Sequence, residues 1–223
     1  YALSYSRDKG IPNWVSWHLD DSWIDFAERQ DDFRGYPDLP TDWYEVTRNS
    51  YTNSGFDRGH NCPSADRTCS EETNSATFYM INMLPQAPNN NRGVWSSLES
   101  FSRELVLTGK EVYVIMGSYG IGGEGSNGEA DYIDNGNIAV PESIWKVLLI
   151  LEEGNNDLLR VDDNTRIVAV DIPNRNNVST NMDWHDYMVN VDSIEARTGY
   201  DLFSELPFSL QNTLEQKVDQ GPW

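Results

Sequence analysis

The chain has 223 residues, of which 38% are hydrophobic, and its formal net charge at pH 7 is −20. Its 8 Trp, 11 Tyr and 7 Phe residues carry enough apolar surface for a core of substantial size. No apolar run reaches membrane-spanning length, so we expect neither a membrane-spanning helix nor a membrane partner. Because no linker or repeat divides the sequence, we predict one domain over residues 1–223.

The charge also bears on nucleic-acid binding. A net charge of −20 argues against a dedicated nucleic-acid-binding protein, because neutralisation of phosphates by basic side chains dominates such binding. An enzyme, however, needs to hold only a few phosphates and must then release its product. Arginines gather between residues 55 and 103, whereas acidic pairs typical of a highly soluble surface lie outside that stretch. The arginines are Arg58, Arg67, Arg92 and Arg103. The acidic pairs are Asp20-Asp21, Asp31-Asp32, Glu152-Glu153 and Asp162-Asp163.

The N-terminal third begins with an alternating segment, residues 15–19 (VSWHL), which predicts a strand. His18 lies inside it, and we expect a structural or surface role for this histidine and for His185 near the C-terminus. Arg29 follows in a polar segment, residues 28–34, which by itself indicates an ordinary charged surface.

His60 stands in different surroundings, within the segment Asp57-Arg58-Gly59-His60. Imidazole titrates near neutral pH, so His60 can act as a general base. Gly59 lacks a Cβ and lets the backbone turn sharply or approach a ligand closely, and Arg58 can bind phosphate. The segment suits phosphodiester hydrolysis, which needs a base, a cation and positive charge around the phosphate.

A long helix is predicted after this segment. Trp95, Leu98 and Leu105 recur at helical spacing, and Gly109 follows as a stop. The pattern predicts an amphipathic helix from Asn90 to Leu107.

Three polar residues share one side of that helix. Asn91, Glu99 and Arg103 are separated by eight and four residues, and each four-residue step turns only ~40° about the axis. Mg²⁺ prefers oxygen ligands and keeps several waters, so the amide oxygen of Asn91 can serve as its main protein ligand. Glu99 can hold a metal-bound water, and Arg103 can reach phosphate.

Cys62 and Cys69 are the only cysteines. Six intervening residues let the chain return on itself, so a disulfide formed in an oxidising compartment is favoured over two free buried thiols. Two thiolates without His or Cys partners do not make a zinc site. The predicted disulfide favours a secreted or periplasmic protein.

The C-terminal half alternates apolar strands with polar turns. Strands are predicted at residues 111–116, 144–151 and 165–171. The glycine-rich residues 117–136 lack the Lys-Ser/Thr of a P-loop. A capping box at Asp192 predicts a short helix ending near Gly199, and residues 209–218 predict another. Because helices do not separate the strands regularly, we predict an α+β fold with a central, mostly antiparallel sheet flanked by helices.

Taken together, the segments DRGHNCPSADRT, NMLPQAPNNNRGVWSSLE and SFSREL resemble the DNA/RNA non-specific endonucleases of the ββα-metal superfamily. The resemblance extends from about Pro12 to the TGYDLF segment and is greatest to secreted bacterial and cyanobacterial sugar-nonspecific nucleases. The DRGH motif followed thirty-one residues later by N-x-x-x-W-x-x-L-E is far more specific than either piece alone. It implies the ββα-metal nuclease fold, cleavage of DNA and RNA to 5′-phosphate products, and Mg²⁺ as cofactor, with Mn²⁺ as a substitute.

The resemblance also implies roles for individual residues. His60 matches the general base, Asn91 the Mg²⁺ ligand and Glu99 the carboxylate behind the metal. Arg58, Arg103 and Arg29 match phosphate-contacting arginines, Asn82 matches an asparagine that supports the site, and Arg67 and Arg92 are expected to bind substrate. A protein inhibitor is a further candidate partner.

Two other functions stay open at this point. One is a catalytically inactive nucleic-acid-binding module, disfavoured because His60, Asn91 and Glu99 are all present. The other is a phosphodiesterase or phosphatase that acts on small molecules, which the catalytic residues alone do not exclude. Digestion of a plasmid by the wild type and by His60→Ala would separate the three.

Overall fold

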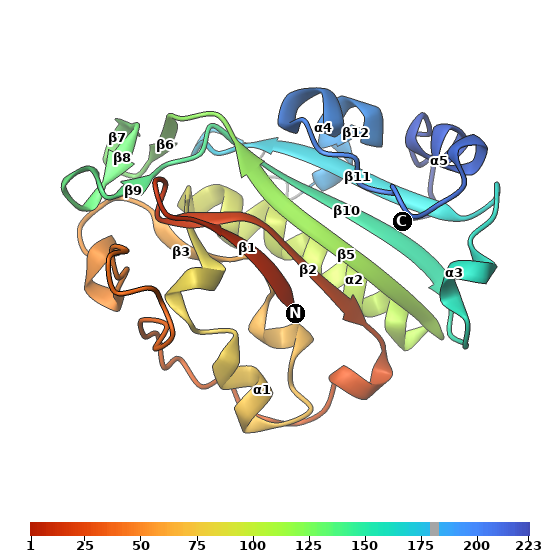
Figure 1. The fold of residues 1–223 in the computed structure, drawn as a ribbon, viewed down its shortest axis with the longest axis horizontal. Helices are drawn as coiled ribbons and strands as arrows, with labels where there is room; N and C mark the ends of the chain where they lie inside the picture. Colours follow the sequence, from red (N-terminus) through yellow and green to blue (C-terminus); the bar gives the residue numbers. More distant parts are fainter. Residues whose placement is uncertain (179–182) are drawn as a thin grey trace.

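The computed structural model describes residues 1–178 and 183–223. Its centre is a six-stranded sheet in the order β1-β2-β5-β10-β11-β12 (Figure 1). Every neighbouring pair in this sheet is antiparallel, which confirms the predicted sheet type. The strands are β1 (Ala2–Ser6), β2 (Ile11–Leu19), β5 (Lys110–Tyr119), β10 (Ser143–Glu152), β11 (Arg166–Pro173) and β12 (Met188–Val189).

A second, two-stranded unit precedes the long helix. β3 (Asp57–His60) pairs with β4 (Met83–Gln86), and β4 leads into a π-helical turn (Asn90–Trp95) and then α2 (Ser96–Leu107). Two antiparallel strands followed by a helix form the ββα arrangement that the sequence predicted.

The remaining elements are short. The other helices are α1 (Glu71–Ala76), α3 (Asp157–Arg160), α4 (Val191–Thr198) and α5 (Phe208–Glu215). The glycine-rich segment forms two small hairpins, β6 (Gly123–Gly125) with β7 (Gly128–Ala130) and β8 (Tyr132–Ile133) with β9 (Ile138–Ala139). Single 3₁₀ turns lie at Asp21–Trp23, Arg48–Tyr51, Ser64–Asp66, Met80–Asn82, Asp134–Gly136 and Trp184–Tyr187.

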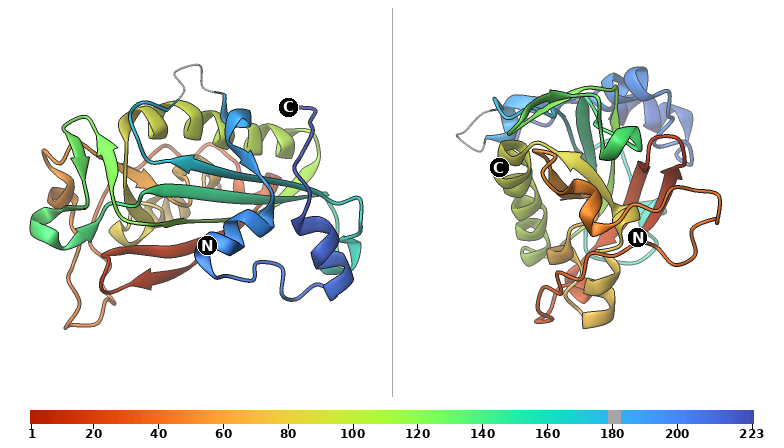
Figure 2. Two further views of the ribbon diagram at one scale, coloured as in Figure 1. Left: turned by 90° about the horizontal axis from the view of Figure 1, so that it is seen from above. Right: turned by 90° about the vertical axis from the view of Figure 1, so that its left-hand side faces the viewer.

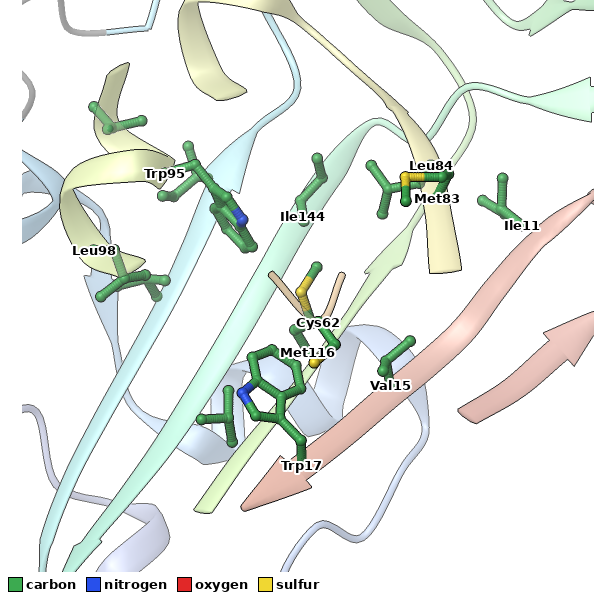
Figure 3. Close-up of a cluster of buried hydrophobic side chains, with 14 of the residues drawn as sticks. Ile11, Val15, Trp17, Cys62, Met83, Leu84, Trp95, Leu98, Met116 and Ile144 are labelled. Atoms are coloured by element: carbon green, nitrogen blue, oxygen red, sulfur yellow. The ribbon is translucent and has the colours of Figure 1, made fainter. Parts of the chain in front are cut away.

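Helices cover both faces of the large sheet. α2 lies on one face, and α4 and α5 lie on the other (Figure 2). Successive side chains of a strand point to opposite faces, so β10 contributes Ile144 and Leu148 to the interior under α2 and Trp145 and Val147 to the interior under α4 and α5. Figure 3 shows the first of these interiors, where side chains from β2, β4, β5, β10 and the long helix meet.

Most predicted elements form, with shifts at their ends. The strands predicted at residues 15–19, 111–116, 144–151 and 165–171 correspond to β2, β5, β10 and β11. The helix predicted from Asn90 is wrong in one respect, because its first six residues are π-helical around Gly93, whose φ of −107° and ψ of −107° are non-helical. The predicted cap of α4 is also wrong: the side chain of Asn190, not Asp192, accepts from the N–H of Ser193.

The predicted disulfide is wrong, since Cys62 and Cys69 are both free. Cys62 is completely buried within the interior under α2 (Figure 3). Cys69 is partly exposed just before α1, with its Sγ 3.2 Å from Thr73 Oγ1. The two side chains occupy different environments although few residues separate them.

Over the described parts of the chain, none of the helices has both the length and the apolar character needed to span a membrane.

Candidate functional site

The β3–β4 pair fixes the backbone that carries His60. Gly59 lies opposite Leu84, and His60 lies opposite Met83. A Cβ at Gly59 would come within 2.3 Å of Gln86 Oε1, so only glycine allows this approach. Gln86 Nε2 donates to Asn90 Oδ1 at 2.9 Å, which ties the strands to the start of the long helix.

His60 lies between two phenylalanine rings. Its ring centroid is 5.6 Å from that of Phe33 and 5.0 Å from that of Phe78, both in edge-on geometry. Burial, together with the charges of Arg29 and Arg58, lowers the pKa of His60 to about 3. The imidazole is therefore neutral around pH 7, which is the form that accepts a proton.

The same phenylalanines place two arginines beside the histidine. The Arg58 guanidinium lies 4.5 Å from the centroid of Phe33, and that of Arg29 lies 4.8 Å from the centroid of Phe78. Arg29 also pairs with Asp31 at 2.9 Å and donates to Ser64 Oγ at 2.8 Å.

Asn91 is oriented by Asp57. Asn91 Nδ2 donates to Asp57 Oδ2 at 2.9 Å. Arg92 holds the same carboxylate with two bonds, from Nε at 2.8 Å and from Nη2 at 2.6 Å. Because the amide nitrogen of Asn91 is directed at Asp57, its amide oxygen is left to accept from another partner.

These residues surround a small polar pocket. Its volume is ≈ 250 Å³. It is lined by Arg29, Asp31, Phe33, Phe56, Asp57, Arg58 and Asn91. The structure thus brings three of the predicted site residues, Arg29, Arg58 and Asn91, together in one pocket with His60 next to it.

Glu99 and Arg103 form a second cluster on α2, outside the lining of that pocket. Arg103 Nη1 bonds to Asp66 Oδ1 at 3.0 Å, and Trp17 Nε1 donates to Asp66 Oδ2 at 3.0 Å. Burial raises the pKa of Glu99 to about 6, while the positive charge of Lys146 opposes this rise. Arg29 links the clusters electrostatically, because its charge lowers the pKa of both His60 and Glu99.

Asn82 supports the loop that follows His60. Its side chain is completely buried and donates to the carbonyls of Cys62 and Thr77, each at 2.9 Å. Its Oδ1 accepts from the N–H of Cys62 at 3.0 Å. Asn82 therefore acts through the backbone around His60.

Arg67 does not reach the pocket. It is 3% exposed, and it donates to the carbonyls of Asp66 at 2.6 Å and His18 at 2.9 Å. Its guanidinium also lies 4.2 Å from the Trp23 ring centroid. These contacts give Arg67 a structural role, so the substrate contact expected of it has no support here.

Comparison with known proteins identifies the family. A family model described as DNA/RNA non-specific endonuclease matches residues 1–209. The chain belongs to this family. Like other members, this endonuclease is a hydrolase that acts on phosphodiester bonds.

Relatives of the endonuclease cover most of its length. A nuclease from Nostoc sp. (strain PCC 7120 / SAG 25.82 / UTEX 2576) is 46% identical over 98% of this chain and 76% of the relative. Nuclease C1 of Cunninghamella echinulata var. echinulata is 30% identical over 94% of this chain and 82% of its own. A crystal structure of an EndoG/EndoGI complex superposes with a TM-score of 0.73, at 26% identity over 88% of this chain and 80% of that one.

Three residues of the endonuclease site escaped the sequence reasoning. Asp57 stands inside the DRGH motif, and its position there could have suggested its contact with Asn91. Asp66 and Lys146 gave no comparable signal. Asp66 lies in a short polar turn, and Lys146 lies in an otherwise apolar strand.

Proposed function

We propose that this endonuclease is a Mg²⁺-dependent enzyme that cuts DNA and RNA without base specificity, with His60 as the general base. The observation that carries the proposal is the arrangement around the small pocket. A neutral imidazole packs on Phe33 at the wall of a pocket that is also lined by two arginines and by an asparagine whose amide oxygen is left available.

The residues present fit a Mg²⁺ ion. Asn91 would hold it through Oδ1, because Asp57 already takes the amide nitrogen. When bound, the cation supplies Lewis-acid stabilisation of the charge that develops on the phosphate and the departing oxygen. Mn²⁺, which accepts similar oxygen ligands, is the expected substitute.

The protein groups then divide the remaining work. His60 takes the proton of the attacking water, which requires the neutral ring that its surroundings maintain. Arg58 and Arg29 stabilise the phosphate oxygens from the pocket wall, and Arg103 adds positive charge from α2. With the 3′ oxygen as leaving group, the products carry 5′ phosphates.

Lack of base specificity follows if the contacts go mainly to the backbone, because phosphates carry no sequence information. The pocket of ≈ 250 Å³ is polar and carries two arginines, which suits a phosphate group. Arg92 remains a substrate contact in this proposal. Its side chain is 70% exposed even though it is bonded to Asp57.

Partners and location are part of the proposal. The EndoG structure that this chain resembles is that of a complex with EndoGI and concerns the mechanism of EndoG inhibition. We propose by analogy that a protein can inhibit this enzyme too. We also propose a secreted or periplasmic location. The predicted disulfide no longer supports it, because both cysteines are free.

Digestion of supercoiled plasmid and of a long RNA tests the proposal. We expect the wild type to degrade both with Mg²⁺ and to stop in EDTA. His60→Ala should lose ~10²–10⁴-fold in turnover, because that is the usual worth of a general base. His185→Ala, at a histidine that packs against Trp184 and Trp223, is the control and should retain activity. Equal cleavage by wild type and His60→Ala would reject the assignment, and binding without cleavage by the wild type would indicate an inactive module.

A further inference from the structure

A buried ammonium group lies in the interior beside the active site. Lys146 is in β10, where its register neighbours are Met116 of β5 and Val170 of β11. Strand alternation directs it to the same face as Ile144 and Leu148, toward α2. Its side chain is 1% exposed. Because an unpaired buried charge is costly, a lysine at this central position needs a partner.

The partner is Glu99. Lys146 Nζ lies 3.8 Å from Glu99 Oε1. The ammonium also lies 4.4 Å from the centroid of the Trp95 ring and 5.6 Å from that of Trp17, both of which belong to the interior shown in Figure 3. Two indole faces and one carboxylate therefore surround the charge and fix where it lies.

The other nearby carboxylate is already satisfied. Asp66 accepts from Trp17 Nε1 through one oxygen and from Arg103 through the other. Glu99, by contrast, accepts no hydrogen bond from residues 1–178 or 183–223 in the structure. Its carboxylate oxygens thus remain able to accept hydrogen bonds, with Lys146 as the nearest cation.

We propose that Lys146 is a positioning residue that keeps the Glu99 carboxylate ionised and directed toward the site. The inference rests on the proposed function, in which Glu99 acts as a carboxylate. The two residues come from different layers, because Lys146 is on the central sheet and Glu99 is on α2. The pair therefore also connects α2, which carries Arg103 and continues the π-helical turn that holds Asn91, to the rigid centre of the fold.

Electrostatics around Glu99 agree with this role. Burial raises the pKa of Glu99 to about 6, the neighbouring Asp66 adds to the rise, and the charges of Lys146, Arg103 and Arg29 oppose it, with Lys146 the strongest. Burial lowers the pKa of Lys146 itself, and the two carboxylates work against that lowering. Removing the ammonium therefore leaves Glu99 with a still higher pKa.

A double-mutant cycle with pH profiles tests the inference. We expect Lys146→Met to lower kcat/KM by ~10–100-fold, as loss of an orienting partner does at metal sites, and to move the acid limb of the profile to higher pH. In a Glu99→Gln background, the same change should cost less than about threefold, because residues that act through one another are non-additive. Lys110→Met, at a partly exposed lysine paired with Glu152, is the control.

The outcomes are separable from those for the proposed function. An equal loss in both backgrounds, or an acid limb that does not move, would overturn the role of Lys146. Full activity of His60→Ala in the same assay would overturn the proposed function instead.

A measurement on the wild type does not depend on how the variant folds. The chain has only four lysines, so the ¹⁵N resonances of their side chains can be assigned. We expect Lys146 Nζ to be charged at pH 7. A neutral amine at that pH would overturn the proposal.

Discussion

The two faces of the sheet have interiors of different composition. Under α2, the buried side chains include Asp66, Asn82 and Lys146, each next to a hydrogen-bonding or charged neighbour. Under α4 and α5, the packed cluster consists of Trp, Val, Leu, Ile and Ala. Buried polarity on the first face thus coincides with the proposed chemistry, and the second face contributes stability.

The second face also holds buried carboxylates. Glu111 is 2% exposed opposite Leu151, but it is paired with His18 and Arg160, whereas Glu215 has no such partner within residues 1–178 and 183–223. Glu215, in α5, is 6% exposed, and its Oε1 has no hydrogen-bond partner among the described residues. It lies near Asp192 and Glu195 of α4, with their carboxylate oxygens within 4.8 Å of one another. Substitutions on the two faces can therefore separate effects on stability from effects on catalysis. Substitution of Glu215 can measure how much an unpaired buried carboxylate lowers the free energy of unfolding.

The largest expected effect is on stability alone. Trp145→Ala empties a fully buried site on the face under α4 and α5, where loss of a large aromatic side chain costs ~3–5 kcal/mol. We expect urea unfolding to show this loss, with kcat nearly unchanged at temperatures where the variant is folded. Leu159→Ala, at an 84% exposed leucine, is the control. A large fall in kcat at full folding would show that the two faces are coupled.

The next effect is on metal dependence alone. Asn91→Ala removes the proposed ligand, so the Mg²⁺ concentration for half-maximal activity should rise by at least ~10–100-fold. Asn91→Asp keeps an oxygen ligand and should respond to Mg²⁺ far better than the alanine variant. Thermal unfolding without metal should be similar for both. An unchanged Mg²⁺ requirement in Asn91→Ala would place the cation elsewhere.

Glu215 predicts a pH-dependent stability. Burial and the charges of Glu195, Asp192 and Asp201 raise its pKa from 4.5 to about 7. The folded protein then binds more protons than the unfolded chain between these values, so the free energy of unfolding falls as pH rises from about 4.5 to about 7.

Glu215→Gln should remove this penalty. At pH 8 the variant should be more stable by about 1 kcal/mol, or ~2–4 °C in Tm, after allowance for screening by solvent. At pH 4 the difference should vanish. Glu205→Gln, at an exposed glutamate, should show neither effect. Equal Tm values for wild type and Glu215→Gln at pH 8 would contradict the assignment.

The smallest expected effect concerns the acidic surface. Of the acidic pairs Asp20-Asp21 and Asp31-Asp32, Asp31 lines the pocket, where it forms an ion pair with Arg29. Asp20 caps a turn through Ser22, and Asp32 pairs with Arg34. Asp31→Asn should therefore raise kcat/KM at low salt by ~2–3-fold, since exposed ion pairs contribute little.

Salt dependence sharpens this last point. Screening weakens both the arginine–phosphate contacts and the repulsion between an anionic protein and a polyanion, with a reach of ~8 Å near physiological ionic strength. We expect kcat/KM of the wild type to stay flat or rise at moderate NaCl before it declines, and Asp31→Asn to flatten the rise. Glu153→Gln makes the same charge change outside the pocket. A steep loss from the lowest salt would show that the acidic charge does not affect substrate capture.

Sequence patterns predicted the sheet well because β-branched and apolar runs such as residues 144–151 have few alternatives to a buried strand. They missed the π-helical turn, since helical spacing does not reveal how Gly93 redirects the backbone. For the site, the DRGH motif combined with N-x-x-x-W-x-x-L-E, through the family resemblance that they carry, predicted that His60, Arg58 and Asn91 belong to one site. Lys146 was missed because its partner is 47 residues away in sequence and meets it only through the packing of α2 on the sheet.

The two free thiols allow local unfolding of the segment beside His60 to be measured. Burial raises the pKa of Cys62 to about 12, so its thiol is protonated and shielded, whereas Cys69 is partly exposed. An alkylating reagent should modify Cys69 first and Cys62 only when the segment bonded to Asn82 unfolds locally. The rate of the slow modification then reports the free energy of opening beside His60. Its change on adding Mg²⁺ or an oligonucleotide would show how firmly each ligand closes the site.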